Sequence, residues 1–240
     1  MSQGLDGGGT LFILFGRHRG EFRAWFEFNP NKVVIAELEG RLCTMLENGM
    51  YSLVERGIVT YSEFAIDVPN AQIEDYVFLS RSHRQQDLGW INNGGIYIGS
   101  RRHGELHFHI YDKQRQLREA ENTVVENSWL RVEARISGKR RFPLRSVLQL
   151  PSPFLNLLVL RRSCVEQVIA DGLLGNIISA QGMPHEIQCQ MSCLNGQQKK
   201  SVLHRLSEFE VDWWGPDLLW GRLEASLGWL HEGMSYSGRA

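Results

Sequence analysis

Two short runs of alternating apolar and polar residues constrain the fold of this chain more than any other feature. The first, from Glu105 to Lys113, reads ELHFHIYDK, and the second, from Trp129 to Ser137, reads WLRVEARIS. Side chains on a β-strand alternate between the two faces of a sheet, so each run predicts a strand with one apolar and one polar face. The polar faces carry a tyrosine, Tyr111, and a carboxylate, Glu133.

Strand parity predicts which polar side chains share a surface. Residues 58–68 form a third predicted strand, which ends before Pro69 because proline cannot donate to a ladder. If the three strands are neighbours, their polar faces form one surface. Its members would be Glu63, Asp67, His107, His109, Tyr111, Lys113, Arg131, Glu133 and Arg135. Carboxylates that hold Mg²⁺ or Mn²⁺ beside a hydroxyl and arginines suit phosphodiester chemistry, because the metal stabilises charge on the phosphate.

Each of these residues also has an ordinary structural interpretation. A tyrosine on a strand is commonly a packing residue, and Glu133 between two arginines is typical of a cross-strand ion pair. Asp67, just before a proline turn, is typical of a turn residue, and the two histidines suit a solvated face. The order of these residues in the chain, rather than any one of them, favours the functional interpretation.

The remaining patterns predict an α+β fold, with an antiparallel sheet and packed helices followed by a mainly helical C-terminal region. Residues 10–30 predict two strands, residues 32–55 a helix, residues 80–93 a loop and residues 96–100 a short strand. Residues 114–126 fit either a helix or a loop, and a helical pattern with packing tryptophans runs from Phe154 onward. The predicted divisions are a flexible N-terminus over 1–9, an α+β domain over 10–142, a helical region over 143–235 and a flexible tail over 236–240.

The distribution of charge says more than its sum. The formal net charge is −1, but residues 101–145 hold eleven Lys and Arg against six Asp and Glu, a local balance of +5. Such a basic region suits the backbone of DNA, although a solvated face has the same composition. The candidate DNA contacts are Arg101, Arg102, Arg115, Arg131, Arg135, Lys139, Arg140 and Arg141.

Cysteine content and hydropathy bear on the compartment. The four cysteines include a CxxxC pair, Cys189 and Cys193, which is too little for a zinc site without a second pair, so reduced thiols are expected. The chain shows no signal segment and no apolar run of the roughly 20 residues that cross a bilayer. We therefore expect a soluble cytoplasmic protein with no membrane partner.

The motifs, taken in order, resemble the replication initiation factor family of rolling-circle plasmids and filamentous phages. Members carry a YIGSR-like strand, a turn, a strand that ends in Tyr-Asn/Asp-Lys and a strand with an Arg-x-Glu centre. The corresponding segments here are Tyr97–Arg101, Tyr111–Lys113 and Arg131–Glu133, with FEFNPNK and FAIDVP upstream also similar to family segments. The resemblance spans about residues 10 to 140, and more loosely the helical remainder.

The resemblance implies a Rep nuclease-like fold and a site-specific DNA nickase that starts rolling-circle replication. Tyr111 would attack a DNA phosphate and form a 5′-phosphotyrosine, with Lys113 in the catalytic set. Mg²⁺ or Mn²⁺ would bind Glu133, Asp67 and Glu63, although many members have aspartate where Glu63 stands. The partner would be origin DNA with a single-stranded or cruciform nick site. A host helicase and a homodimer are compatible with this function.

Several alternatives stay open. The HFH triplet at residues 107–109 also fits the metal motif of another endonuclease class, but that class places its tyrosine on a later helix, and no tyrosine lies between Tyr111 and Tyr236. We therefore expect His107 and His109 to be supporting metal ligands, and a phosphate contact is an equal alternative for His109. A non-catalytic DNA-binding replication or copy-control protein would keep the basic region without needing Tyr111. An α+β interaction domain that docks a partner through its Trp-rich C-terminal region would bind no DNA.

Overall fold

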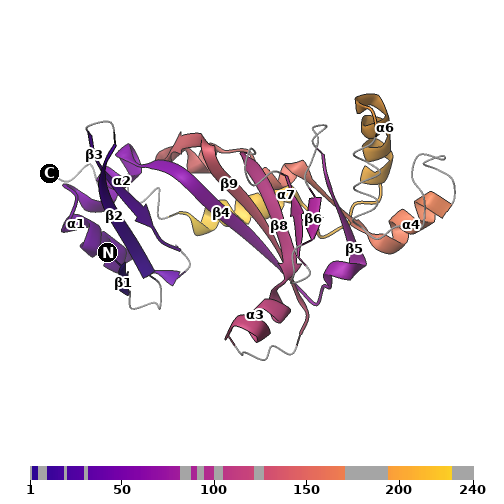
Figure 1. The fold of residues 1–240 in the computed structure, drawn as a ribbon, viewed down its shortest axis with the longest axis horizontal. Helices are drawn as coiled ribbons and strands as arrows, with labels where there is room; N and C mark the ends of the chain where they lie inside the picture. The colour runs from indigo at the N-terminus through magenta and orange to yellow at the C-terminus, as the bar shows by residue number, and fades with distance from the viewer. Residues whose placement is uncertain are drawn as a thin grey trace. The chain divides into compact units, whose positions relative to one another are not determined.

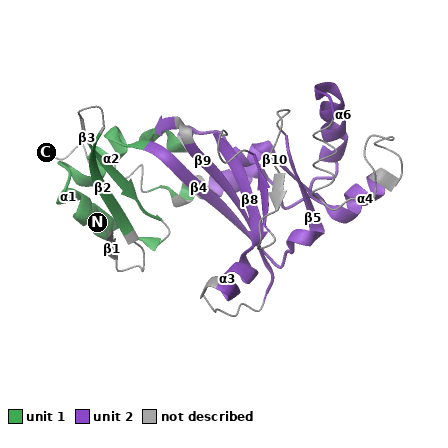
Figure 2. Cartoon of the chain, viewed as in Figure 1, with its two compact units in different colours: residues 1–58, 143–148, 225–240 green, residues 59–142, 149–224 purple. Residues whose placement is uncertain are grey.

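The computed structural model describes residues 2–4, 10–18, 21–29, 32–81, 88–90, 95–99, 105–121, 127–170 and 194–228. The chain divides into two compact units (Figure 2). Unit 1 comprises residues 1–58, 143–148 and 225–240, and unit 2 comprises residues 59–142 and 149–224. Each unit draws on segments that are distant in the sequence. The domain limits that the sequence predicts at residues 142 and 235 stay predictions.

Unit 1 contains a three-stranded antiparallel sheet in the order β1-β2-β3 (Figure 1). Its strands are β1 Ser2–Gly4, β2 Thr10–His18 and β3 Glu21–Glu27. The β2–β3 hairpin is the one that the alternating pattern predicts. Residues 2–4 lie in the predicted flexible N-terminus, yet they pair with β2, where Gln3 lies opposite Leu11. A strand of three residues is formed by backbone hydrogen bonds to its neighbour, and it is too short for its sequence to show an alternating pattern.

A turn divides the segment for which the sequence predicts one helix, residues 32–55. The two helices are α1 Ile35–Cys43 and α2 Gly49–Arg56. Asn48, which precedes α2, and Gly49, the first residue of α2, have positive φ angles of 61° and 45°. Glycine and asparagine adopt this conformation at low cost, and a Cβ at position 49 would collide with Cys43 Sγ. The prediction of a single helix is therefore wrong, because Asn48-Gly49 turns the chain.

Unit 2 is built on a five-stranded sheet in the order β4-β9-β8-β7-β6 (Figure 1). The strands are β4 Ile58–Pro69, β6 Leu88–Trp90, β7 Ile96–Ile98, β8 Leu106–Asp112 and β9 Trp129–Pro143. The pairs β6–β7, β7–β8 and β8–β9 are antiparallel. The three strands that carry the polar residues, β4, β9 and β8, are neighbours, as a shared surface requires. The sequence misses β6, because three residues within a polar segment are too few to show a period.

Aromatic residues from the C-terminal part of the chain pack against the apolar side chains of this sheet. Phe64 of β4 meets Trp220 edge-on at a centroid distance of 4.9 Å, and Phe108 of β8 lies 6.4 Å from Phe154. Trp214 packs against Phe154 at 5.8 Å. The covering residues lie in the 3₁₀ helix η4 Pro153–Asn156, in helix α7 Pro216–Ser226 and just before α7. Trp214 and Trp220 are buried, so their predicted packing role is confirmed.

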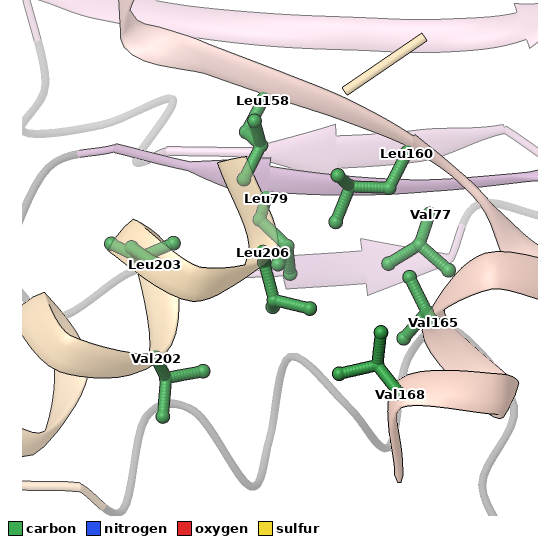
Figure 3. Close-up of a cluster of buried hydrophobic side chains, with 9 residues drawn as sticks. All are labelled: Val77, Leu79, Leu158, Leu160, Val165, Val168, Val202, Leu203 and Leu206. Atoms are coloured by element: carbon green, nitrogen blue, oxygen red, sulfur yellow. The ribbon is translucent and has the colours of Figure 1, made fainter. Parts of the chain in front are cut away.

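A two-stranded antiparallel sheet forms a second core in unit 2. Its strands are β5 Tyr76–Ser80 and β10 Leu157–Arg161, which pack with helices α4 Arg162–Ala170 and α6 Gly196–Ser207. Figure 3 shows the buried cluster: Val77, Leu79, Leu158, Leu160, Val165, Val168, Val202, Leu203 and Leu206. The sequence predicts only helix from residue 154 onward, and β10 corrects that prediction. A continuous apolar run such as LLVL fits a buried strand as well as a buried helix.

The remaining elements are short. Helix α3 Lys113–Glu121 follows β8 directly, and the 3₁₀ helices η2 and η3 span Ile73–Asp75 and Leu144–Gln149. The antiparallel sheet and these helices confirm the α+β class. Cys43 and Cys164 are free thiols, whereas residues 189 and 193 lie outside the described residues. In the part of the chain that the structure describes, no helix has the length and apolar character to cross a membrane.

Candidate active site

The pairing of β8 with β9 arranges the polar face of the five-stranded sheet. The opposed pairs are Tyr111 with Arg131, His109 with Glu133 and His107 with Arg135. Directly opposed residues of an antiparallel pair point to the same face. The other face carries apolar residues such as Ile110 and Val132, both fully buried. The strand parity that the sequence predicts for these two strands is therefore confirmed.

The Tyr111 hydroxyl donates a hydrogen bond to Glu133 Oε1 at 2.6 Å. Both residues are buried, with 7% and 2% of their surface exposed. The bond runs diagonally across the strand pair, a distance that a tyrosine is long enough to span. Burial raises the pKa of Tyr111 well above its ordinary value, and the bond to the Glu133 carboxylate raises this pKa further. The phenol is therefore firmly protonated in this arrangement.

Glu133 is held as an anion by the donors around it. Arg135 Nη2 donates to Glu133 Oε2 at 2.6 Å, and His109 Nδ1 lies 3.4 Å from the same oxygen. Burial by itself would raise the pKa of Glu133. The hydrogen bonds from His109 and Tyr111 and the charge of Arg135 outweigh it and lower the pKa to about 2. So acidic a group is a weak base, and it becomes an effective proton acceptor only when one of these donors leaves.

His109 lies between two tyrosine rings on neighbouring strands. Its ring stacks on Tyr97 of β7 at a centroid distance of 4.3 Å and on Tyr111 at 4.4 Å. Its Nε2 atom is buried, and no hydrogen-bond partner for it lies among the described residues. The stack fixes the plane of the imidazole and limits rotation of the Tyr111 ring. The rotamer that carries the hydroxyl is therefore set by packing as well as by Glu133.

A second tyrosine and carboxylate lie on β4, at the edge of the same face. The Tyr61 hydroxyl donates to Glu63 Oε2 at 2.7 Å, and Arg135 Nε lies 2.8 Å from that oxygen in an ion pair. One guanidinium thus contacts two carboxylates, Glu63 and Glu133. Partial burial raises the pKa of Tyr61 to about 12, with the bond to Glu63 as the next cause.

Asp67 and Arg131 form a separate ion pair on this face. Arg131 donates from Nε and Nη2 to the two oxygens of Asp67, each at 2.6 Å. Two parallel bonds fix the guanidinium in one plane, which is the geometry that arginine also uses to bind phosphate. The bond to Asp67 raises the pKa of Arg131, although burial opposes this shift. Asp67 is thus a partner of arginine here rather than the turn residue of the alternative interpretation.

Comparison with known proteins identifies the region that holds the tyrosine and Glu133. Residues 77–155 match the replication initiation factor family. The resemblance that the sequence motifs show is confirmed over these residues. No curated protein matches the chain. The replication initiation factor region includes β7, β8, β9 and their stacked rings, whereas Tyr61, Glu63 and Asp67 precede it.

Two neighbouring side chains on this face carry donor atoms of the kind that the metal implied by the replication initiation factor resemblance would need. Glu133 and His109 are adjacent, and carboxylate oxygen with imidazole nitrogen is a donor set that Mn²⁺ accepts. Glu63 and Asp67 are held by Arg135 and Arg131, so they could join only after these arginines move. Within the described residues, no group of three or more His, Cys, Asp or Glu side chains is arranged to hold a metal ion.

The predicted lysine lies off the strand surface. Lys113 is the first residue of helix α3, and its ammonium donates to Gln116 at 2.6 Å. Strand parity therefore does not extend to Lys113, because β8 ends at Asp112. His107 is buried and lies on the polar face, opposite Arg135. The roles that the sequence predicts for Lys113 and His107 stay predictions.

The candidate DNA contacts fall into three groups. Arg115 on α3 and Arg141 on β9 are exposed, and Arg115 pairs with Glu119 at 2.8 Å. Lys139 and Arg140 lie on β9, but their side chains are outside the described set, as are residues 101 and 102 altogether. Arg131 and Arg135 are bound to carboxylates on the polar face.

Sequence reasoning missed two residues of this arrangement, Tyr61 and Tyr97. Tyr61 lies two positions before Glu63, so strand parity places it on the same face, and the signal was present. Tyr97 stands within the YIGSR-like segment, but its contact with His109 depends on the register of β7 with β8, which the sequence does not reveal. Ring stacking between strands needs that register.

Proposed function

We propose that this chain is a rolling-circle replication initiator, a nickase and strand transferase that cuts its origin DNA through Tyr111. The observation that carries the proposal is the 2.6 Å hydrogen bond from the Tyr111 hydroxyl to buried Glu133, inside the replication initiation factor region. A tyrosine hydroxyl needs an adjacent base or cation to attack phosphate, and this hydroxyl has both close by. The family match indicates a role in starting DNA replication.

The proposed reaction is a transesterification. The Tyr111 oxygen attacks the phosphorus of one DNA linkage, and the bond from phosphorus to the 3′-oxygen breaks. The phenolic proton passes to Glu133, and the departing 3′-oxygen takes a proton from solvent. The products are a 5′-phosphotyrosine and a 3′-hydroxyl that a polymerase can extend. One phosphoester replaces another, so no nucleotide hydrolysis is needed.

DNA binding would prepare the base for this step. An arginine fork binds phosphate as well as carboxylate, so a DNA phosphate competes with Glu133 for Arg135. When Arg135 turns to the phosphate, Glu133 loses a positive neighbour and its pKa rises. The carboxylate therefore gains basicity when the phosphate arrives. Without DNA, the tyrosine stays protonated and protected from unproductive reaction.

The proposal includes Mg²⁺ or Mn²⁺ as the cofactor. Glu133 Oε2 and His109 would hold the ion, Glu133 Oε1 would remain for the phenolic proton, and Glu63, Asp67 and His107 are the further candidates for ligands. When bound, the ion would supply positive charge that stabilises the phosphate during displacement. Support comes from the adjacency of a carboxylate and an imidazole beside the tyrosine hydroxyl.

The proposed substrate is origin DNA that presents its nick site as a single strand or a cruciform. Contacts to its phosphates would come from Arg101, Arg102, Arg115, Lys139, Arg140 and Arg141, with Arg131 and Arg135 after their release. Lys113 is proposed for the catalytic set. Binding of this kind weakens steeply with salt. A host helicase would unwind the duplex, and a homodimer is compatible with the proposal.

A denaturing gel with labelled origin DNA tests this function. Wild type with Mg²⁺ or Mn²⁺ should give a slow-migrating covalent adduct, and Tyr111→Phe should reduce it by at least about 100-fold, because removal of an essential group in catalysis costs that much. Tyr51→Phe is the control, since it removes a hydroxyl from helix α2 and leaves the sheet untouched. An undiminished adduct in Tyr111→Phe would assign the attack to another group.

A second candidate is a non-catalytic DNA-binding replication or copy-control protein on the same scaffold. The observation that favours it is the burial and strongly raised pKa of Tyr111, which also suit a structural tyrosine. This candidate predicts salt-dependent binding to the origin with no adduct, and equal binding by wild type and Tyr111→Phe. The same gel, together with a binding titration, distinguishes the two functions.

A further inference from the structure

Two tyrosine–carboxylate pairs share the polar face of the sheet. Tyr111 donates to Glu133 at 2.6 Å, and Tyr61 donates to Glu63 at 2.7 Å. Arg135 joins the pairs, because its Nη2 contacts Glu133 at 2.6 Å and its Nε lies 2.8 Å from Glu63. The two hydroxyls are therefore linked through a single guanidinium, and each has its own carboxylate as proton acceptor.

The two tyrosines differ in access. Tyr61 is 53% exposed and Tyr111 is 7% exposed. The fold gains little from a hydroxyl on a half-exposed ring, since its hydrogen bond replaces one that water would otherwise make. The replication initiation factor match begins at residue 77, so it says nothing about Tyr61. Tyr61 carries an accessible hydroxyl beside a carboxylate, on the same polar face as Tyr111. These are the features of a second nucleophile.

We propose that Tyr61 is a second attacking hydroxyl, which takes up a DNA strand when the strand held by Tyr111 is joined and released. This inference rests on the proposed function. The Tyr61 oxygen attacks the phosphorus at a second copy of the nick site, and the bond from that phosphorus to its 3′-oxygen breaks. The phenolic proton passes to Glu63, and the 3′-oxygen leaves as a hydroxyl after taking a proton from solvent.

The freed 3′-hydroxyl then closes the first strand. It attacks the phosphorus held by Tyr111, the bond between phosphorus and the Tyr111 oxygen breaks, and the tyrosine regains a proton while the hydroxyl loses one. Each step exchanges one phosphoester for another, so the number of such bonds is conserved and no co-reactant is required. After this step a DNA strand is linked to Tyr61 and the hydroxyl of Tyr111 is free again. A single polypeptide can therefore perform both cleavage and joining.

The test uses the full chain, Mn²⁺ and a labelled DNA that carries two copies of the nick site. The amounts of first covalent adduct and of joined DNA product are measured for three proteins: wild type, Tyr61→Phe and the control Tyr51→Phe. We expect Tyr61→Phe to form the first adduct within about twofold of wild type and to lose joined product by about tenfold or more. Glu63→Gln should lower the ratio of joined product to first adduct, with Glu47→Gln on the other unit as its control.

Peptide mapping of the wild-type adduct gives a readout that needs no variant. During turnover, covalent DNA should appear on the peptides of both Tyr61 and Tyr111. Adduct confined to Tyr111, with wild-type joining by Tyr61→Phe, would overturn the inference and leave the nickase intact, with a second copy of the chain supplying the other hydroxyl. Absence of any adduct in wild type would instead overturn the proposed function and this inference together.

Discussion

The guanidinium of Arg135 donates to Glu133 at 2.6 Å within a buried part of the polar face. This contact neutralises a carboxylate that is 2% exposed and that also accepts the Tyr111 hydrogen bond. The fold keeps a charged group in its interior by giving it a cation and two further donors. The same contact limits how readily the carboxylate can take up a proton.

Replacement of Arg135 by glutamine should destabilise unit 2. Glu133 would be left as a buried charge without its cation, and breaking a buried pair in this way costs about 3 kcal/mol. The control is Arg145→Gln, which breaks an exposed pair with Glu55 and should cost less than about 1 kcal/mol. Urea unfolding of the three proteins measures the difference. Equal midpoints for the two variants would show that Glu133 does not depend on Arg135.

Acid should weaken the contribution of Glu133 to stability in a defined window. Its pKa falls from an ordinary value of 4.5 to about 2 in the folded chain, so the folded state favours the ionised form. The contribution is complete above pH 4.5 and is lost as the pH falls toward 2, with a full size of roughly 3 kcal/mol. The stabilities of wild type and Glu133→Gln should therefore converge as the pH falls from 4.5 toward 2, as measured by urea titrations. A constant gap would contradict the depressed pKa.

Removal of divalent metal should abolish adduct formation but leave DNA binding in place. If His109 is a metal ligand, wild type should form the adduct faster with Mn²⁺ than with Mg²⁺, because an imidazole ligand favours Mn²⁺. His109→Gln should reduce that preference by about tenfold, since loss of an interaction near the metal costs that order. The measurement is the rate of adduct formation with each ion after treatment with a chelator. An unchanged preference in the variant would remove His109 from the ligand set.

Truncation of Trp220 should destabilise the sheet through its apolar face. Trp220 is 5% exposed and lies edge-on to Phe64, so Trp220→Ala should cost about 3 to 5 kcal/mol. Leu218→Ala on the same helix is the control, because Leu218 is 66% exposed and its loss should cost under about 0.5 kcal/mol. Thermal and urea unfolding give both values. Similar losses for both variants would mean that α7 does not pack on the sheet.

The sequence predicts the polar face well because a strand has a period of two. Once residues 105–113 and 129–137 are recognised as strands, parity puts Tyr111 and Glu133 on polar faces that the β8–β9 pairing joins. The ion pairs depend on information that the sequence does not carry. Whether Arg135 contacts Glu133, Glu63 or both depends on strand register and rotamers. Lys113 shows the limit of parity, because it belongs to the helix that follows.

Buried and turning segments are harder to predict than the polar strands. The run LLVL in β10 is apolar on every side, so it shows neither the period of a helix nor that of a strand. The predicted helix over 32–55 fails because α1 ends at Cys43 and a second helix begins at Gly49, after a turn in which Asn48 has a positive φ angle. The Asn-Gly pair is itself a turn signal and opposes the apolar spacing around it.

The pairing of β5 with β10 has a consequence for the autonomy of the replication initiation factor region. Residues 76–80 pair with residues 157–161, so the contact that closes this sheet is non-local in sequence, and such contacts slow folding. A chain that stopped at residue 142 would leave β5 as an apolar edge with unpaired backbone groups, and Phe64 without Trp220. Such an edge recruits other chains. The strands that hold the tyrosine therefore depend on the C-terminal segment to cover this apolar edge.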